Sequence, residues 1–333
     1  MTTNEDQYYM QRALELAARS IGRTSPNPMV GAVIVKNGQI IGEGYHEQAG
    51  TPHAEVHALS AAGERSVGAT LYVSLEPCSH FGRTPPCVDA VIAAGIIRTV
   101  VAVQDPNPMV AGQGINKLRQ AGIEVEVGLL QHEAARLNEV FFKYIQTGLP
   151  FVAIKTAMTL DGKIAAYTGD SRWITGTSAR NYVHQLRNIY DAILVGIGTV
   201  LKDDPQLNTR LEDVDTHDPV RIIIDTNLDL PIGSNIVKSA KHQRTIVFCS
   251  SEIEMTKRTR LEKMGLETVG LVCAGGLVPL RKVLELLGEM KLCSLLVEAG
   301  GEINAYLLAN RLADKAYWFI APKIIGGRQA PSP

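Results

Sequence analysis

The sequence predicts an α/β protein with two domains, and three observations support this. The chain has 333 residues, whereas a typical domain has roughly 100–200. Helical and strand patterns alternate along both halves, which is typical of sheets covered by helices. Gly148 and Pro150 follow a long helical pattern, and a new strand begins directly after them. We therefore expect one domain over residues 1–146 and a second over residues 150–333.

Composition and charge exclude several classes of protein. Apolar residues make up 45% and charged residues 20%, which excludes a disordered tail or a collagen-like chain. The net charge is −1, without the positive excess of a nucleic-acid-binding protein. The polar N-terminus does not resemble a secretory signal, and no apolar run approaches the ~18 residues of a membrane span. Five scattered cysteines do not suggest a disulfide framework. We therefore expect a cytoplasmic protein with neither nucleic acid nor a membrane as its partner. That the chain forms a homo-oligomer is a separate expectation, which composition does not decide.

The first half is predicted to begin with a helix and a hairpin, followed by alternating strands and helices. Helices are expected over residues 9–21, 53–62, 87–94, 114–121 and 131–144, and strands over 30–35, 39–44, 71–75, 97–103 and 124–127. Asn37-Gly38 is the turn signal that joins the first two strands, and Gly95 ends a helix. This order predicts a mixed sheet covered by helices.

The second half repeats the alternation with apolar strands. Strands are expected over residues 151–157, 192–195, 220–224, 245–249, 268–273, 294–297 and 316–321, and helices over 178–188, 279–287 and 303–310. This predicts a second α/β domain. A short echo links 25–30 to 105–110, because Asn27 and Asn107 each stand between two prolines. The echo indicates either two similar turns or two loops that present amides to one pocket.

Three residues of the first half form a pattern of zinc ligands, namely His53, Cys78 and Cys87. One imidazole and two thiolates suit a tetrahedral zinc ion, and three protein ligands leave a fourth position open for catalysis. His53 and Cys87 lie near predicted helix N-termini, where the helix dipole stabilises negative charge. Glu55 could take a proton from water at the open position and pass it to a substrate. The pattern predicts one zinc per chain and a catalytic role for Glu55.

The same residues allow less specific interpretations. A structural zinc would need a fourth ligand, and the two cysteines could instead be buried free thiols. His57, one helical turn after His53, is expected to pack inside the protein, since a His/Cys/Cys set is already complete. Cys249, Cys273 and Cys293 lie on or beside apolar strands and are expected to be small core residues.

The ligand pattern resembles the zinc nucleobase deaminases, whose signature is H-x-E followed by P-C and a second cysteine. Their cysteines usually form C-x-x-C, whereas eight residues separate Cys78 from Cys87 here. Longer sequence motifs restrict the resemblance to one family. The first half has T-S-P-N-P-M-V-G-A-V-I-V, H-A-E-V-H-A-L, E-P-C-S-H-F-G-R-T-P-P-C and Q-D-P-N-P. The second half has K-T-A-M-T-L-D-G-K-I-A, S-R-W-I-T-G, D-D-P-Q-L-N-T-R and V-E-A-G-G. Over essentially its whole length the chain resembles the bifunctional riboflavin-biosynthesis deaminase/reductase family of bacteria.

The resemblance implies a cytidine-deaminase-like α/β/α domain followed by a dihydrofolate-reductase-like α/β domain. It implies that the first domain uses Zn²⁺ to hydrolyse an exocyclic amine from a diamino-pyrimidinone ribosylamine phosphate. The second domain would then use NADPH to reduce the ribosyl side chain to a ribityl group. The implied partner is a small pyrimidine ribosylamine phosphate.

By matching motifs, the resemblance implies His53, Cys78 and Cys87 as zinc ligands and Glu55 as the proton carrier. It also implies contacts to the deaminase substrate from Asn27, His46, His80, Asp105 and Asn107. Amides and carboxylates suit a flat heterocycle that is rich in amines and carbonyls. Arg83 would suit the substrate phosphate, with a solvated loop charge as the alternative, and His46 could instead cap a turn.

In the second half, Gly300 and Gly301 follow a predicted strand and begin a helix. Backbone N–H groups at this position could bind a cofactor pyrophosphate. A plain tight turn would explain the two glycines as well. The resemblance implies NADPH contacts from Ala157, Trp173, Thr199, Asp203, Thr226, Gly300, Gly301, Glu302, Ile303, Asn304, Ala305 and Tyr306. It implies contacts to the reductase substrate from Ser171, Arg187, Leu207, Arg210 and Glu298. Lys155 and Asp161 are further candidates for this cleft, and Lys155 could instead be an edge charge that faces water.

The chain departs from the family pattern at its end, because members usually continue for a few dozen residues beyond the Ile324–Gly327 run. We expect this to weaken the reductase sheet more than the deaminase site. Two alternative functions stay open. A nucleic-acid base deaminase with an accessory binding domain would need aromatic platforms and basic grooves, which 5% aromatic residues and an even charge disfavour. A non-catalytic protein with a structural zinc and a nucleotide-sensing domain would leave Glu55 without a role.

Overall fold

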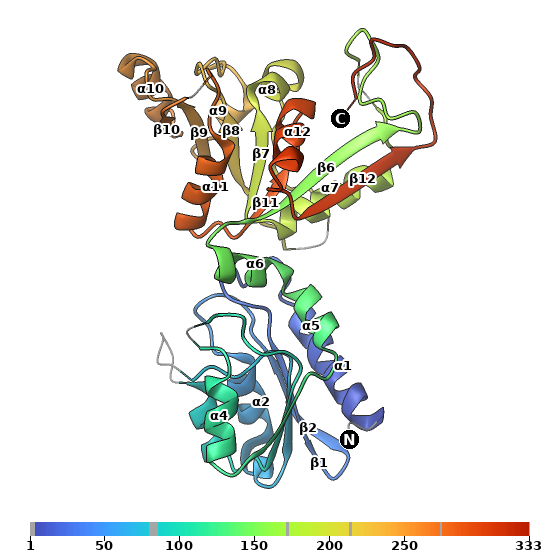
Figure 1. Cartoon of the computed structure of the whole chain (residues 1–333), viewed down its shortest axis with the longest axis vertical. Helices are drawn as coiled ribbons and strands as arrows, with labels where there is room; N and C mark the ends of the chain where they lie inside the picture. The colour runs from blue at the N-terminus through green and yellow to red at the C-terminus, as the bar shows by residue number, and fades with distance from the viewer. Residues whose placement is uncertain are drawn as a thin grey trace. The chain divides into compact units, whose positions relative to one another are not determined.

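The computed structural model describes residues 4–79, 86–108, 110–170, 173–212, 215–273 and 275–332. The chain divides into two compact units, Met1–Gly148 and Leu149–Pro333, and each contains its own sheet and helices (Figure 1). Within the described ranges, no helix is long and apolar enough to cross a membrane.

The first unit is a five-stranded sheet with helices on both faces, as expected. Its strands are β1 (Gly31–Lys36), β2 (Gln39–Tyr45), β3 (Thr70–Val73), β4 (Arg98–Val101) and β5 (Glu124–Val127), in the order β2-β1-β3-β4-β5. Its helices are α1 (Asn4–Ala18), α2 (Ala54–Ala62), α3 (Cys87–Ala93), α4 (Gln113–Gln120), α5 (Gln131–Leu137) and α6 (Glu139–Thr147), with a short 3-10 turn over Gly63–Ser66. Strand β1 is antiparallel to β2 and β3, whereas β3, β4 and β5 are parallel. The hairpin and the mixed sheet are therefore confirmed.

Two hydrophobic cores cover the two faces of this sheet. One contains Met10 and Ala13 of α1, and the other contains Ala58 of α2, together with alternate residues of the strands. Where strand glycines face a helix, the helix backbone lies so close that no side chain would fit. A Cβ at Gly31 would lie 2.0 Å from the Ala13 carbonyl oxygen. Glycine in β1 therefore fixes how near α1 can pack, because any larger residue would force the helix away.

Two helices differ from the sequence prediction. The first begins at Asn4 rather than Tyr9, because Asp6 in its first turn is anchored by Tyr72 and Arg98 of the sheet. The single helix expected over residues 131–144 is two helices, α5 and α6, which meet at Asn138. The apolar spacing of the two segments is continuous, so the sequence pattern alone does not reveal the break.

The second unit is a seven-stranded sheet in the order β10-β9-β8-β7-β11-β6-β12, and every pair of neighbouring strands is parallel. Its strands are β6 (Phe151–Thr159), β7 (Ala192–Gly196), β8 (Val220–Ile224), β9 (Thr245–Ser250), β10 (Glu267–Leu271), β11 (Ser294–Val297) and β12 (Lys315–Ala321). Its helices are α7 (Thr177–Ile189), α8 (Ile197–Asp203), α9 (Asn235–Lys238), α10 (Met255–Glu262), α11 (Leu280–Glu289) and α12 (Gly301–Ala309).

All seven strands expected in the second half are present, whereas α8, α9 and α10 were not expected. The central strands are buried on both faces, which explains their continuous apolar runs. Cys249 and Cys293 are buried as expected, and Cys273 is half-buried. Because the strands are parallel, the loops that follow them gather at one edge of the sheet, where ligands bind in such folds.

Candidate functional site

One edge of the first sheet gathers most of the predicted deaminase residues. Cys78 and Asp105 follow the ends of the parallel strands β3 and β4. Strand β1 runs the other way, so that Asn27, which precedes it, lies at the same edge; the Ser74 amide donates a hydrogen bond to the Gly31 carbonyl there. His46 follows β2 at this edge as well. The fold thus collects residues that are far apart in the sequence.

The candidate metal ligands converge at two helix N-termini. His53 is the residue before α2, and Cys87 is the first residue of α3. His53 Nδ1 lies 3.1 Å from Cys87 Sγ and 3.6 Å from Cys78 Sγ, and the three ligand atoms are all within 4.8 Å of one another. With metal–ligand bonds of about 2.0–2.3 Å, tetrahedral ligand atoms are about 3.3–3.8 Å apart. The three side chains therefore fit a tetrahedral zinc ion.

Of the two cysteines, Cys78 is the one prepared to act as a thiolate before a metal binds. The Cys87 amide, at the start of α3, donates a hydrogen bond to Cys78 Sγ at 3.3 Å. The hydrogen bond from the Cys87 thiol lowers the pKa of Cys78 to about 4, against the effect of burial, and His53 adds to it. That same hydrogen bond and burial raise the pKa of Cys87. The pair therefore shares one proton, which a metal ion would displace.

Glu55 is buried in the first turn of α2, two residues after His53. Burial and the nearby Cys78 raise the pKa of its carboxyl to about 7, although a backbone hydrogen bond, His53 and a hydrogen bond with Cys87 oppose the shift. Helix α2 lies close to β2: a Cβ at Gly44 would be only 2.5 Å from the Ala54 carbonyl oxygen. A carboxyl group poised near neutral pH beside the candidate metal ligands can both accept and donate a proton.

Asn27 and His46 form a chain of contacts that leads to the metal ligands. Asn27 Nδ2 lies 3.1 Å from His46 Nε2, and His46 Nδ1 lies 3.2 Å from the Pro52 carbonyl oxygen. A proton on Nδ1 would satisfy that carbonyl and leave Nε2 to accept from the Asn27 amide. The His46 ring packs edge-on against His53, with the ring centroids 5.3 Å apart. Burial lowers the pKa of His46, which favours this neutral form.

The second Pro-flanked loop lies at the same edge. Asp105 Oδ1 accepts a hydrogen bond from the Asn107 amide at 2.8 Å, which closes a tight turn, and both residues are half-buried. The two echoed loops, which carry Asn27 and Asn107, thus both flank the sheet edge that carries Cys78. His80 and Arg83 of the deaminase set, and Ser171 of the reductase set, lie outside the described residues.

The second unit holds a buried cluster of charges around Glu298, which follows β11. Arg187 of α7 donates to both Glu298 oxygens, at 2.8 and 3.0 Å, and Lys155 of β6 lies 3.0 Å from Glu298. These two cations lower the pKa of Glu298 against the effect of burial. Lys155 therefore points toward a buried carboxylate, and the alternative of an edge charge facing water is wrong. Two cations around one carboxylate leave net positive charge.

A loop after α8 extends this positive region. Arg187 also donates to the Asn208 carbonyl oxygen at 3.1 Å, and Arg210 donates to the Asn208 side-chain oxygen at 2.5 Å. Leu207 is buried with a φ of 55°, a left-handed conformation that places Asn208 in this position. The Arg210 amide donates to His184 Nδ1 at 3.2 Å. The structure thus brings Arg187, Arg210 and Glu298 together, with Leu207 beside them.

The predicted cofactor residues lie along four adjacent strands, in the order β8-β7-β11-β6. Thr226 follows β8, Thr199 and Asp203 lie in α8 after β7, Gly300 to Tyr306 follow β11, and Ala157 lies near the end of β6. A Cβ at Gly196 would lie 3.0 Å from Ile303, which shows that the end of β7, directly before α8, packs against α12. Among the described residues, apart from its two chain neighbours, none has an atom within 4 Å of the position that a Cβ at Gly300 would take. This edge can accept a nicotinamide cofactor.

Two further candidates lie near the ends of β6 and of the neighbouring strand β12. Trp173 is exposed, and its ring packs under the Arg180 guanidinium, 4.7 Å from the ring centroid. Asp161, in the turn after β6, accepts hydrogen bonds from the Ile325 and Gly326 amides. Asp161 therefore fastens the C-terminal segment to that turn, which is a structural role that sequence reasoning did not foresee.

Sequence reasoning also missed two residues that hold the deaminase loops. Asn138, between α5 and α6, accepts from the Met29 amide at 2.8 Å and donates to the Met29 carbonyl at 2.9 Å, and so fixes the loop of Asn27. Glu76 accepts four backbone hydrogen bonds beside Cys78. The only signal for Glu76 is its place two residues before Cys78, and the sequence carries no signal for Asn138.

Comparisons with known proteins agree with this arrangement. The family model described as RibD C-terminal domain matches residues 150–333, and the model described as cytidine and deoxycytidylate deaminase zinc-binding region matches residues 3–103. The riboflavin biosynthesis protein RibD of Actinobacillus pleuropneumoniae is 47% identical over 331 residues, covering 99% of this chain and 87% of that protein. The RibD protein of Escherichia coli is 45% identical over 342 residues, covering 97% and 89%.

Solved structures are equally similar. Acinetobacter baumannii RibD, form 1, superposes with a TM-score of 0.89 at 42% identity, covering 98% of this chain and 89% of that one. A Thermotoga maritima structure has a TM-score of 0.84 at 43% identity, covering 96% and 88%. Its title names a diaminohydroxyphosphoribosylaminopyrimidine deaminase and 5-amino-6-(5-phosphoribosylamino)uracil reductase. These matches do not favour a nucleic-acid base deaminase. The chain belongs to the RibD family of riboflavin biosynthesis proteins, bifunctional enzymes with a zinc-binding deaminase domain and a reductase domain.

Proposed function

We propose that the chain carries out two successive steps on one small molecule. The first removes an exocyclic amine from 2,5-diamino-6-ribosylamino-4(3H)-pyrimidinone 5′-phosphate by hydrolysis. The second reduces the ribosyl side chain of the product to a ribityl group with NADPH. The two activities named for the Thermotoga maritima structure support this choice of substrate. We assign the first step to residues 1–146 and the second to residues 150–333.

The observation that carries the deaminase proposal is a buried carboxyl group beside three converging metal ligands. His53, Cys78 and Cys87 would hold the zinc ion, which when bound would polarise a water molecule and make it more acidic. Glu55 accepts the proton that this water loses and returns it to the amino nitrogen of the substrate. A C–O bond forms, the C–N bond breaks and ammonia leaves.

We propose that the flanking loops orient the heterocycle. Asn27 and His46 present an amide and a neutral imidazole on one side, and Asp105 and Asn107 lie at the end of the adjacent strand β4. Together these groups can both donate to and accept from the amines and carbonyls of the ring. His80 and Arg83 complete this proposed set from the sequence, with Arg83 toward the phosphate.

In the reductase domain, we propose that the cations around Glu298 bind the substrate phosphate. Arg187 and Lys155 are held by Glu298, which orients them and leaves net positive charge, and Arg210 adds a further guanidinium. Ser171 and Leu207 complete the proposed substrate set. A bound nicotinamide cofactor would supply the reducing equivalents, and the glycine-led start of α12 would hold its phosphates. The cofactor set is Ala157, Trp173, Thr199, Asp203, Thr226 and Gly300 to Tyr306.

Mass spectrometry of the products tests both steps. Incubation with the diamino-pyrimidinone phosphate should release ammonia, and NADPH should then be oxidised. The variant Glu55→Gln keeps the shape of the side chain but not its proton, so deamination should fall by about two to four orders of magnitude while zinc stays bound. The same variant should still reduce the deaminated intermediate. Normal deamination by Glu55→Gln would show that another group moves the proton.

A separate variant tests the phosphate site. Arg210→Ala should accumulate the deaminated but unreduced intermediate, because it loses a charge-assisted contact to the phosphate. Equal loss of both activities in a folded Arg210→Ala protein would contradict two separate sites. We also propose a cytoplasmic location, because thiolate ligands such as Cys78 persist in a reducing compartment. A homo-oligomeric state stays a prediction, which light scattering would test.

A further inference from the structure

In the part of the chain that the structure describes, the buried carboxylate of Glu76 accepts hydrogen bonds from backbone amides and from no side chain. It lies directly after β3 and is 6% exposed. Its Oε2 accepts from the Asp105 and Gly112 amides at 3.1 and 2.9 Å, and its Oε1 accepts from the Gly114 and Ile115 amides at 2.9 and 3.2 Å. Each oxygen of the Glu76 side chain thus accepts hydrogen bonds from two backbone N–H groups.

These four amides belong to the segment that carries two proposed substrate contacts. Asp105 opens that segment, and Gly114 and Ile115 are in the first turn of α4. The residue before α4, Gly112, has no side chain to satisfy the first helical amides, so that Glu76 does this from a neighbouring strand. A Cβ at Gly114 would lie only 2.1 Å from the Pro77 carbonyl oxygen. The segment therefore sits tightly against residues 76–77.

The chain continues from Glu76 through Pro77 directly to Cys78. The Glu76 amide donates to the Val103 carbonyl oxygen at 3.0 Å, so the ends of β3 and β4 are also joined through the backbone. One carboxylate thus ties the strand that delivers a metal ligand to the loop of Asp105 and Asn107. A shift of this side chain would move that loop relative to Cys78.

We propose that Glu76 is a positioning residue of the deaminase, which fixes the Asp105–Asn107 loop at its working distance from the metal ligands. The proposal rests on the proposed function, in which this loop contacts the substrate. Contacts that bind the substrate equally before and during reaction raise KM when they are lost, with little change in kcat. A carboxylate that merely stabilises the fold would instead lower the melting temperature and leave KM unchanged.

The test variant is Glu76→Gln, which keeps the size of the side chain. An amide has one acceptor oxygen, and its NH2 group would face two backbone N–H donors. We expect the KM for deamination to rise about 10- to 100-fold with kcat within about threefold, since the loss of a substrate hydrogen bond to a charged group such as the Asp105 carboxylate weakens binding by about that much. Zinc content should not change, and neither should NADPH oxidation when the deaminated intermediate is supplied. Hydrogen exchange in residues 104–116 should become faster.

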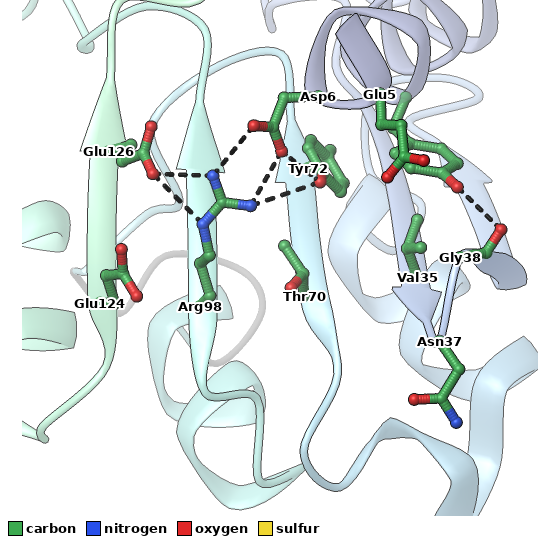
Figure 2. A pocket seen from close by; sticks show the side chains of 11 residues that line it. Glu5, Asp6, Val35, Asn37, Gly38, Thr70, Tyr72, Arg98, Glu124 and Glu126 are labelled. Carbon is green, nitrogen blue, oxygen red and sulfur yellow. Dashed lines mark hydrogen bonds and ion pairs between the residues drawn. The ribbon is translucent and has the colours of Figure 1, made fainter. Parts of the chain in front are cut away.

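Asp6→Asn is the matched control, because Asp6 is also a buried carboxylate of the first unit. It accepts from Tyr72 at 2.6 Å and from Arg98 at 2.8 Å, and Figure 2 shows this group in a pocket beside Glu124 and Glu126. The pocket includes the first residues of β3, β4 and β5, at the opposite end of the strands from Glu76 and Cys78. Asp6→Asn should lower the melting temperature and leave the KM for deamination unchanged.

The outcomes separate the possibilities. A raised KM in Glu76→Gln but not in Asp6→Asn supports the positioning role, and an unchanged KM in Glu76→Gln overturns it. Asn107→Ala tests the underlying function: if its KM is normal, the loop does not contact the substrate. If Asn107→Ala raises KM while Glu76→Gln does not, the positioning proposal alone fails. If Glu76→Gln does not fold, Glu76→Asp keeps the charge but loses reach, and the same KM and kcat criteria apply to it.

Discussion

The buried charge cluster of the reductase domain gives a quantitative test of the structure. We predict that Glu298→Gln strongly destabilises this domain, because it removes the carboxylate that pairs directly with both Lys155 and Arg187 and leaves the more distant Asp218 near Arg187. The Glu298 side chain is 8% exposed, and those of Lys155 and Arg187 are 16% and 11% exposed. The two cations would stay largely buried without a carboxylate in direct contact, which is the costly half of a broken buried ion pair.

The expected magnitude follows from the contacts that are lost. Removing one partner of a buried pair costs about 3–5 kcal/mol. Glutamine keeps one acceptor oxygen for Arg187, so we expect the lower end, about 3 kcal/mol, whereas Glu298→Ala should reach the upper end. With a urea m-value of about 2 kcal/mol/M, a loss of 3 kcal/mol lowers the unfolding midpoint by about 1.5 M.

Tryptophan fluorescence can report this domain by itself. The chain has two tryptophans, Trp173 and Trp318, and both lie in the second unit. Trp318 lies on β12 and pairs with Thr156 of β6, next to Lys155. Urea unfolding followed by fluorescence therefore measures the reductase domain even when the deaminase domain unfolds at another concentration.

A solvent-exposed ion pair with the same hydrogen-bond distances provides the control for the effect of burial. Arg244 donates to Glu267 at 2.8 and 3.0 Å, the distances of the Arg187–Glu298 pair, but the Glu267 side chain is 48% exposed. Surface pairs contribute about 0.2–1 kcal/mol, so Glu267→Gln should move the midpoint by no more than about 0.5 M. Equal shifts in Glu298→Gln and Glu267→Gln would refute the argument from burial.

Three further predictions follow from other parts of the molecule. Purified protein should contain about one zinc per chain, and Cys87→Ser should lose both zinc and deamination; metal retention measured by atomic absorption would contradict the ligand set. Asn138→Ala should raise the KM for deamination and keep zinc, because it frees the Met29 backbone that holds the Asn27 loop. Burial, Arg187 and Arg210 lower the pKa of His184 to about 4 from an ordinary 6.5. The unfolded chain therefore binds a proton below about pH 6.5, whereas the folded chain binds it only below about pH 4. Stability should fall as the pH is lowered from 6.5 to 4. In His184→Gln, the urea midpoint should depend less on pH over the same range; an unaltered dependence would exclude His184 as its source.

Local signals in the sequence predicted the secondary structure wherever a pattern had a single interpretation. Asn37-Gly38 predicted the hairpin, and continuous apolar runs predicted all seven strands of the second sheet. The break at Asn138 was not predictable from local spacing, and the partner of its side chain, Met29, is 109 residues away. Helix α8 was missed because it directly follows β7 without a separate loop signal.

The sequence also determined which residue types could carry the chemistry. The residue types of His53, Glu55, Cys78 and Cys87 predict a zinc site with an open position and a nearby proton carrier, and the resemblance of their order to the zinc deaminase signature indicates deamination. What the sequence could not determine is the environment of these groups. The pKa of Glu55 is about 7 because the fold buries its carboxyl, and residues from several segments are needed for that burial.

The tertiary structure alone decided which charges meet and which loops are held in place. Lys155, Arg187 and Glu298 come from β6, α7 and the end of β11, and only the parallel order β7-β11-β6 brings them within 3.0 Å. In the sequence, Lys155 was equally an exposed edge charge. Glu76 was likewise only a neighbour of Cys78, because its four amide partners lie 29 to 39 residues away. Hydrogen bonds and ion pairs depend on distances of a few ångströms, and the packing of whole strands and helices sets those distances.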